Sequence, residues 1–145
     1  RLAGPLVCML ADVDFFKHVN DQYGHQVGDR VLRQIASILG QDLRGSDVLA
    51  RYGGEEFVLL LPGTTQAQGA AIAERLRSNV EHSAFIIPEG IDLDVTVSIG
   101  LVCLEPGADT YGPDPAVWLF QQVDAALYEA KQTGRNRVVH AHPHY

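Results

Sequence analysis

Apolar residues occur along this chain both as short continuous runs and as alternating stripes. The first run, from Pro5 to Asp14, is apolar until it reaches two acids, which predicts a buried strand whose carboxyl end emerges at the surface. Two further strands are predicted around Gly53 and Gly54, because paired glycines tolerate the positive φ angles of a hairpin. From residue 91 to 104 the odd positions are apolar, and the even positions are polar or small up to Gly100. This period of two is typical of a strand with one buried face.

Apolar residues at helical spacing predict helices at residues 14–24, 28–44, 64–82 and 117–134, with a loop at 105–115 and a last short strand at 136–141. We expect these helices to pack on one face of a mainly antiparallel sheet, which is an α+β layering. In this arrangement the first strand lies beside the central hairpin. Asp12 and Asp14 would then approach Glu55 and Glu56.

Length, charge and cysteine content limit the classes of protein to which this chain can belong. With 145 residues the chain is long enough for one domain, and its formal net charge of -7 argues against a duplex nucleic-acid binder. A nucleotide ligand remains compatible with this charge, because bound metal ions supply positive charge. Cys8 and Cys103 lie in apolar runs and are interpreted as reduced core thiols, which favours a cytoplasmic location. No signal peptide or membrane-spanning run is visible, and the start at Arg1 suggests a piece of a longer protein.

Two adjacent glutamates, Glu55 and Glu56, follow the glycine pair directly. Carboxylates that gather in one place repel each other unless cations lie between them. Oxygen ligands suit Mg²⁺ or Mn²⁺, which also hold phosphates. The alternative is a solvated acidic tip of a hairpin, and that alternative stays open for this motif taken alone.

Other polar residues suit a nucleotide. The segment "DFFK" opens a helix, where backbone amides are able to cradle a phosphate, and Lys131 and Arg135 stand near a helix end. Asn20 and Asp29 carry an amide and a carboxylate that match the donor and acceptor edge of guanine. Each feature also has a purely structural interpretation. The segment "DFFK" would be a strand-to-helix connection, and Lys131 and Arg135 would be cations that favour a helix C-terminus. Asn20 would be a helix-end residue, and Asp29 would be an N-cap.

Three segments together carry a resemblance to a known family: "DVDFFKHVNDQYGHQVGD", "RYGGEEF" and "ALYEAKQTGRNRV". The chain resembles the GGDEF-domain family of diguanylate cyclases, in its GGEEF form. The resemblance runs from the first strand to Val138 and implies an α+β, ferredoxin-like palm with a mainly antiparallel central sheet flanked by helices, similar to nucleotide cyclase catalytic domains. We expect the catalytic domain to occupy residues 1–139. Residues 140–145 would form a C-terminal tail, whose His140, His142 and His144 are assigned no function.

The resemblance implies an enzyme that condenses two GTP molecules into cyclic di-GMP and releases two pyrophosphates. The metal ligands would be Asp12, the backbone carbonyl of Val13, Glu55 and Glu56, with two Mg²⁺ or Mn²⁺ ions for each GTP. Glu55 would help to deprotonate the attacking hydroxyl, and Lys17 would assist at the phosphates. The GTP-binding residues carried over from the family are Phe15, Phe16, Lys17, Asn20, Asp29, Gly53, Gly54, Lys131 and Arg135.

The family also implies partners and regulation. Catalysis would need a homodimer, because one domain holds one GTP. Arg44 and Asp47 match an RxxD product-inhibition site, to which a neighbouring domain would add Arg75. An upstream sensor domain would lie outside this chain, the whole protein could be membrane-bound, and this domain would contact no DNA, RNA or membrane. The alternatives are a module that only binds cyclic di-GMP or GTP, a cyclase with a mononucleotide product, and a purely structural domain.

Overall fold

The computed structural model describes residues 4–87, 90, 92–107 and 112–141 of the chain. Over these residues the elements follow the order β1 (Leu6–Val13), α1 (Phe16–Tyr23), α2 (His25–Gly40), β2 (Val48–Arg51), β3 (Glu56–Pro62), α3 (Gln66–Glu81), β4 (Phe85–Ile86), β5 (Asp92–Leu93), β6 (Val97–Leu104), α4 (Pro115–Gln132) and β7 (Val138–His140). The predicted order of strands and helices is confirmed, and β4 is an addition. The predicted tail begins inside β7 at His140, whereas His142 and His144 lie outside the described residues.

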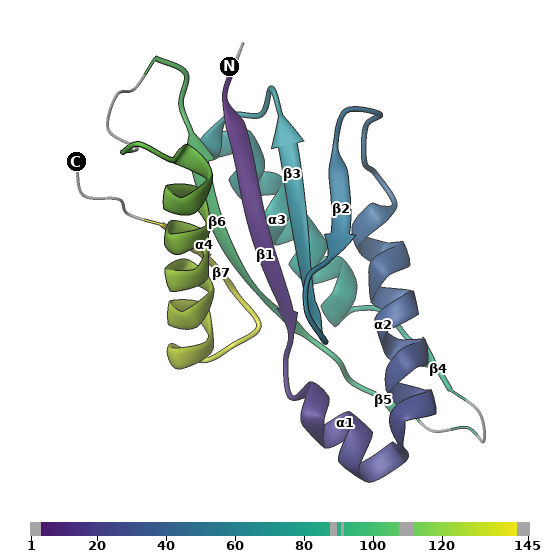
Figure 1. Ribbon diagram of the computed structural model, residues 1–145. Helices are drawn as coiled ribbons and strands as arrows, with labels where there is room; N and C mark the ends of the chain where they lie inside the picture. Colours follow the sequence, from purple (N-terminus) through teal and green to yellow (C-terminus); the bar gives the residue numbers. More distant parts are fainter. Residues whose placement is uncertain (1–3, 88–89, 91, 108–111, 142–145) are drawn as a thin grey trace.

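The main sheet has five strands in the described part of the chain, in the order β2-β3-β1-β6-β7 (Figure 1). All neighbours are antiparallel except β6 and β7, which run parallel. The first strand therefore lies beside the central hairpin, as predicted, and Asp12 stands opposite Glu56 in the register of β1 and β3. The α+β class is confirmed.

Helices cover both faces of this sheet, so the prediction of helices on one face is wrong. One core cluster joins Val7 and Met9 of β1 to residues of α2 and α3. A second cluster joins Cys8 and Leu10, the alternate residues of β1, to α4 on the opposite face (Figure 1). The continuous apolar run of β1 is explained by this arrangement, because a strand that is covered on both faces has no solvent side.

The predicted single strand from residue 91 to 104 is also corrected. Residues 92–93 form β5, which pairs with β4 in a separate ribbon, and only 97–104 belong to the main sheet. Every residue of β6 is buried, including the even positions that the pattern assigned to solvent. Gly100 explains why: a Cβ there would lie 2.5 Å from the backbone nitrogen of Leu127, so only glycine lets α4 approach this closely.

Local signals account for most helix ends. Thr65 caps α3 in a reciprocal capping box with Gln68, as its threonines predicted, and Asp114 caps α4 ahead of Pro115. Helix α2 begins at His25, three residues before the predicted start, and Gly24 separates it from α1. Among the described residues, none of the helices combines the length and apolarity needed to cross a bilayer.

Candidate active site

The carboxyl end of β1 and the turn before β3 bring the predicted acids together. Asp12 is buried at the end of β1, opposite Glu56, and the Val13 N–H donates to the Glu55 carbonyl at 3.2 Å. Sheet pairing therefore fixes the backbone positions of these residues relative to one another. The predicted approach of Asp12 to the two glutamates is confirmed, and we call Asp12, Glu55 and Glu56 the acidic centre. Asp14 was predicted to approach the glutamates as well, but its carboxylate bonds Thr96 and Ser98 on the β6 side of β1, opposite to β3.

The electrostatics of the acidic centre favour a cation. Burial raises the pKa of Asp12, and the hydrogen bond and charge of Lys131 oppose that rise. Burial and then the charge of Asp12 raise the pKa values of both Glu55 and Glu56. Lys131 Nζ lies 2.6 Å from Asp12 Oδ2, so one helix-borne ammonium already partly neutralises the centre.

The donor set fits a hard divalent ion that is shared with a phosphate ligand. Within the residues that the structure describes, His, Cys, Asp and Glu side chains form no group of three or more that would hold a metal unaided. Mg²⁺ commonly uses one or two carboxylates and takes its remaining ligands from water and substrate phosphates. Asp12 and Glu55 or Glu56, with the Val13 carbonyl, meet that smaller requirement.

The glycine pair shapes the turn that carries the glutamates. Gly53 has φ 80°, and the Tyr52 N–H donates to the Glu56 carbonyl at 2.6 Å. Arg51 donates from Nε and Nη2 to the Gly54 carbonyl at 3.0 and 2.6 Å. The turn is thus fixed at both ends, and the sequence pattern gave no signal for this contribution of Arg51.

The connection from β1 to α1 separates its two phenylalanines. Phe16 is buried in the core, whereas Phe15 is 59% exposed in the left-handed conformation with φ 56°. Helix α1 begins at Phe16, so the first amides of the helix have no acceptors within it. Arg135 lies over the Phe15 ring, with Cζ 4.6 Å from the centroid. Lys17 does not join the acidic centre, since its ammonium pairs with Asp21 on exposed α1.

Asn20 lies in α1 and Asp29 in α2, and their side chains differ in exposure to solvent. The Asn20 Oδ1 atom is buried and has no hydrogen-bond partner among the described residues. Asp29 is exposed within α2, so its alternative role as an N-cap is excluded by the start at His25. A Cβ at Gly28 would lie 1.9 Å from Asn20 Oδ1, so the glycine leaves room for the Asn20 side chain. The sequence pattern did not predict this role of Gly28.

The predicted RxxD residues line a separate cavity of about 420 Å³. Arg44 Nη2 lies 3.2 Å from Asp47 Oδ1, and the same nitrogen donates to the Pro62 carbonyl at 2.8 Å. Arg75 lines the same cavity in the same domain, where its Nε lies 3.9 Å from Asp42 Oδ2. The structure thus brings Arg44, Asp47 and Arg75 together within one copy of the chain.

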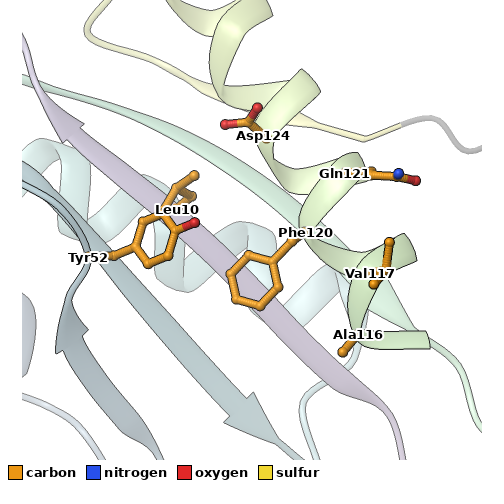
Figure 2. Close-up of a pocket in the computed structure, with 7 residues that line it drawn as sticks. All are labelled: Leu10, Tyr52, Ala116, Val117, Phe120, Gln121 and Asp124. Carbon is orange, nitrogen blue, oxygen red and sulfur yellow. The ribbon is translucent and has the colours of Figure 1, made fainter. Parts of the chain in front are cut away.

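Another cavity, of about 520 Å³, lies between β1, the β2–β3 turn and α4 (Figure 2). Tyr52 and Phe120 stack across it with ring centroids 5.9 Å apart. Its lining is mostly apolar, and Asp124 is its single carboxylate. This cavity therefore lacks the convergent charges of the acidic centre, which remains the stronger candidate for chemistry.

Comparisons with known proteins show the family of this chain. The family model described as "Diguanylate cyclase, GGDEF domain" matches residues 2–137. The response regulator PleD of Caulobacter vibrioides is 43% identical over 136 residues, which cover 93% of this chain and 29% of that protein. The probable diguanylate cyclase DgcT of Escherichia coli is 45% identical over 136 residues, with the same two coverages, 93% and 29%. The chain thus spans less than a third of the length of either relative.

A solved structure shares the fold closely. The GGDEF domain of DgcB from Caulobacter crescentus, crystallised in complex with c-di-GMP, superposes with a TM-score of 0.85. It is 34% identical, and the match covers 94% of this chain and 78% of that one.

Proposed function

This chain belongs to the GGDEF-domain family of diguanylate cyclases, and from that premise we propose that it condenses two GTP molecules into cyclic di-GMP and two pyrophosphates. The observation that carries the proposal is the acidic centre, in which sheet pairing sets buried Asp12 against Glu55 and Glu56. Lys131 bonds Asp12, and the positive charges of Lys131 and Arg135 both act on that carboxylate. Metal-assisted phosphoryl transfer needs this combination of carboxylates and cations.

Asp12, the Val13 carbonyl, Glu55 and Glu56 would hold Mg²⁺ or Mn²⁺, and a bound metal would stabilise the charge that develops on the phosphate oxygens. The chain's own cations act on the same charge. Arg135 and Lys131 would pair with phosphate oxygens, and the amides at the start of α1 would donate to them. Lys17 would have to leave Asp21 to reach the phosphates, which its 86% exposed side chain permits.

In the reaction, the 3′-oxygen of one GTP forms a bond to the α-phosphorus of the other, and the bond from that phosphorus to the β-phosphate oxygen breaks. Pyrophosphate leaves with the bonding electrons. The hydroxyl proton would pass to Glu55, which the turn before β3 holds in the acidic centre. Repeating the step with the two roles exchanged closes the ring.

Guanine would be read by Asn20 and Asp29. The unpartnered Oδ1 of Asn20 supports this role, because an acceptor that is buried without a donor is costly unless a ligand satisfies it. Asp29 would accept from the N–H groups of the base. Adenine presents a different pattern of donors and acceptors, so we expect GTP to be preferred over ATP.

Two copies of the domain would face each other, each presenting one GTP, so the active form would be a homodimer. The cavity at Arg44, Asp47 and Arg75 would take cyclic di-GMP as a feedback ligand, since guanidinium groups stack on guanine and bind phosphate. The same cavity favours the one competing function, a module that binds cyclic di-GMP without making it.

Pyrophosphate release from GTP and Mg²⁺ tests the proposal. We expect release in the parent protein, with a rate per domain that rises with protein concentration because two copies are required. Asp12→Asn should abolish release, while Asp92→Asn, at an exposed position on β5, should retain it. Retained release in Asp12→Asn would contradict the assignment of the acidic centre.

A further inference from the structure

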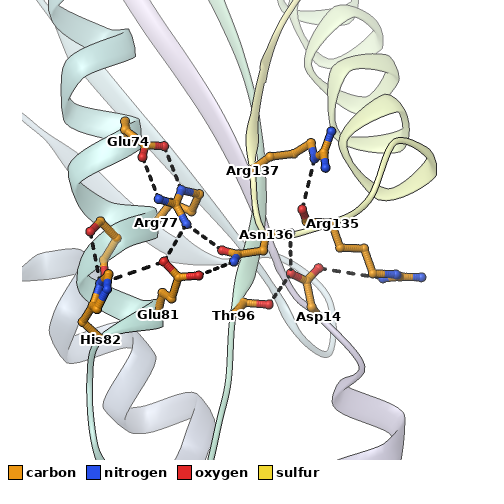
Figure 3. A network of polar contacts seen from close by, with 10 residues as sticks. Asp14, Glu74, Arg77, Glu81, His82, Thr96, Arg135, Asn136 and Arg137 are labelled. Atoms are coloured by element: carbon orange, nitrogen blue, oxygen red, sulfur yellow. Dashed lines mark hydrogen bonds and ion pairs between the residues drawn. The ribbon is translucent and has the colours of Figure 1, made fainter.

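Asp14 is buried and makes its side-chain hydrogen bonds on the β6 side of β1, within a polar network (Figure 3). Its carboxylate accepts hydrogen bonds from Thr96 Oγ1 at 2.7 Å, Ser98 Oγ at 2.6 Å and the Asn136 backbone N–H at 3.0 Å. Arg135 Nη1 lies 3.8 Å from it. The carboxylate therefore ties the end of β1 to β6 and to the turn that follows α4.

That turn has an unusual backbone. Arg135 and Asn136 both have positive φ angles, 62° and 46°, directly after Gly134. Non-glycine residues adopt the left-handed region only at an energetic cost, and here two of them do so in succession. Such a conformation persists only where the surroundings impose it.

The side chain of Asn136 supplies the remaining restraint. Its Oδ1 accepts from Arg77 Nη1 at 2.8 Å, and its Nδ2 donates to Glu81 Oε2 at 2.5 Å. Arg77 is itself fixed, because Glu74 binds its Nε and Nη2 at 2.7 and 2.6 Å and its side chain is only 14% exposed. The turn is thus braced against α3 (Figure 3).

We propose that Asn136, braced by Arg77 and Glu81, is a positioning residue that holds Arg135 over the start of α1, where the triphosphate of GTP would bind. This inference rests on the proposed function. Arg135 is the residue held, since its guanidinium lies 4.6 Å from the Phe15 ring centroid. A planar guanidinium binds phosphate well only in the correct orientation, and the left-handed turn sets that orientation.

Asn136→Gly separates positioning from folding, because glycine keeps the left-handed backbone and removes both side-chain hydrogen bonds. The measurement is the affinity for a non-hydrolysable GTP analogue with Mg²⁺, well below the melting temperature of each variant. We expect Asn136→Gly to bind the analogue about ten- to a hundredfold more weakly, the usual effect of losing a hydrogen bond to a charged group. Arg77→Gln, which removes the brace from the other side, should weaken binding in the same direction.

The matched control is Glu129→Gln, which removes an exposed carboxylate from α4 outside the network of Arg77, Glu81 and Asn136; it should bind the analogue as the parent does. A double-mutant cycle then separates positioning from general loosening. If Asn136 acts through Arg135, adding Asn136→Gly to Arg135→Ala should cause no further loss.

Full additivity of the two losses, or unchanged affinity in Asn136→Gly, would overturn the inference while leaving the proposed function intact. A parent protein that binds no GTP analogue would overturn the proposed function itself, and the inference with it.

Discussion

Lys131→Met removes the ammonium that bonds Asp12 and retains much of the apolar stem. Breaking a fully buried ion pair costs about 3–5 kcal/mol. Here the Asp12 side chain is 6% exposed, but that of Lys131 is 27% exposed, and water screens the pair. We therefore expect the metal-free variant to lose about 1–3 kcal/mol of unfolding free energy at pH 8.

The sign of the pH dependence follows from Asp12. Burial already places the pKa of Asp12 above its usual value, and Lys131 opposes that rise. Without Lys131 the pKa rises further, so the folded variant holds a proton that the parent has released. The loss of stability is complete above the pKa of Asp12 in the variant, shrinks as the pH falls through that pKa, and is gone below the lower pKa of Asp12 in the parent.

Urea unfolding in a series of buffers from pH 8 downwards, in the presence of a chelator, measures both effects. Lys17→Met is the matched control, because Lys17 pairs with Asp21 on the exposed surface and should show no measurable change. Added Mg²⁺ should restore part of the loss in Lys131→Met, since a cation would again neutralise Asp12. A loss that stays constant as the pH is lowered over the whole range in which the protein is folded, or no loss at pH 8, would refute the reasoning.

Three further outcomes are expected. Gly100→Ala places a Cβ 2.5 Å from the Leu127 nitrogen, so unfolding free energy should fall by about 1–3 kcal/mol; an unchanged melting temperature would contradict the close packing of α4. Burial raises the pKa of Cys8 and Cys103 to about 12, so a thiol reagent at neutral pH should label them only after unfolding, and rapid labelling of native protein would oppose this. Arg44→Ala should relieve product inhibition, and the assignment fails if cyclic di-GMP accumulates no further than in the parent.

The sequence predicted most of the elements, because most of them have a local signal, whereas the short β4–β5 ribbon was missed. The continuous apolar run of β1, the glycine pair of the hairpin and the threonine cap of α3 are all decided by neighbouring residues. The layering was predicted wrongly for a physical reason. Small residues at even positions of β6 were interpreted as facing solvent. Gly100 is small for another reason, because the backbone of α4 packs directly against it.

For the candidate site, too, some residues were predicted from the sequence and others were not. Asp12, Glu55 and Glu56 were predicted to meet, since one strand pairing brings them together. The brace at Asn136 was not predicted, because its partner Asp14 is 122 residues away and Arg77 is 59 residues away. The left-handed backbone of Arg135 and Asn136 was not predicted either, since this pair of residues does not by itself indicate two successive positive φ angles.

Identification of the product by mass spectrometry tests the central claim most directly. The domain, stripped of nucleotide, is incubated at high protein concentration with GTP and Mg²⁺ or Mn²⁺. The account predicts cyclic di-GMP from the parent and from Glu129→Ala, an exposed change on α4, and none from Glu55→Ala. A mononucleotide product, cyclic di-GMP from Glu55→Ala, or unreacted GTP even when a dimerising coiled coil is fused ahead of the domain would contradict it.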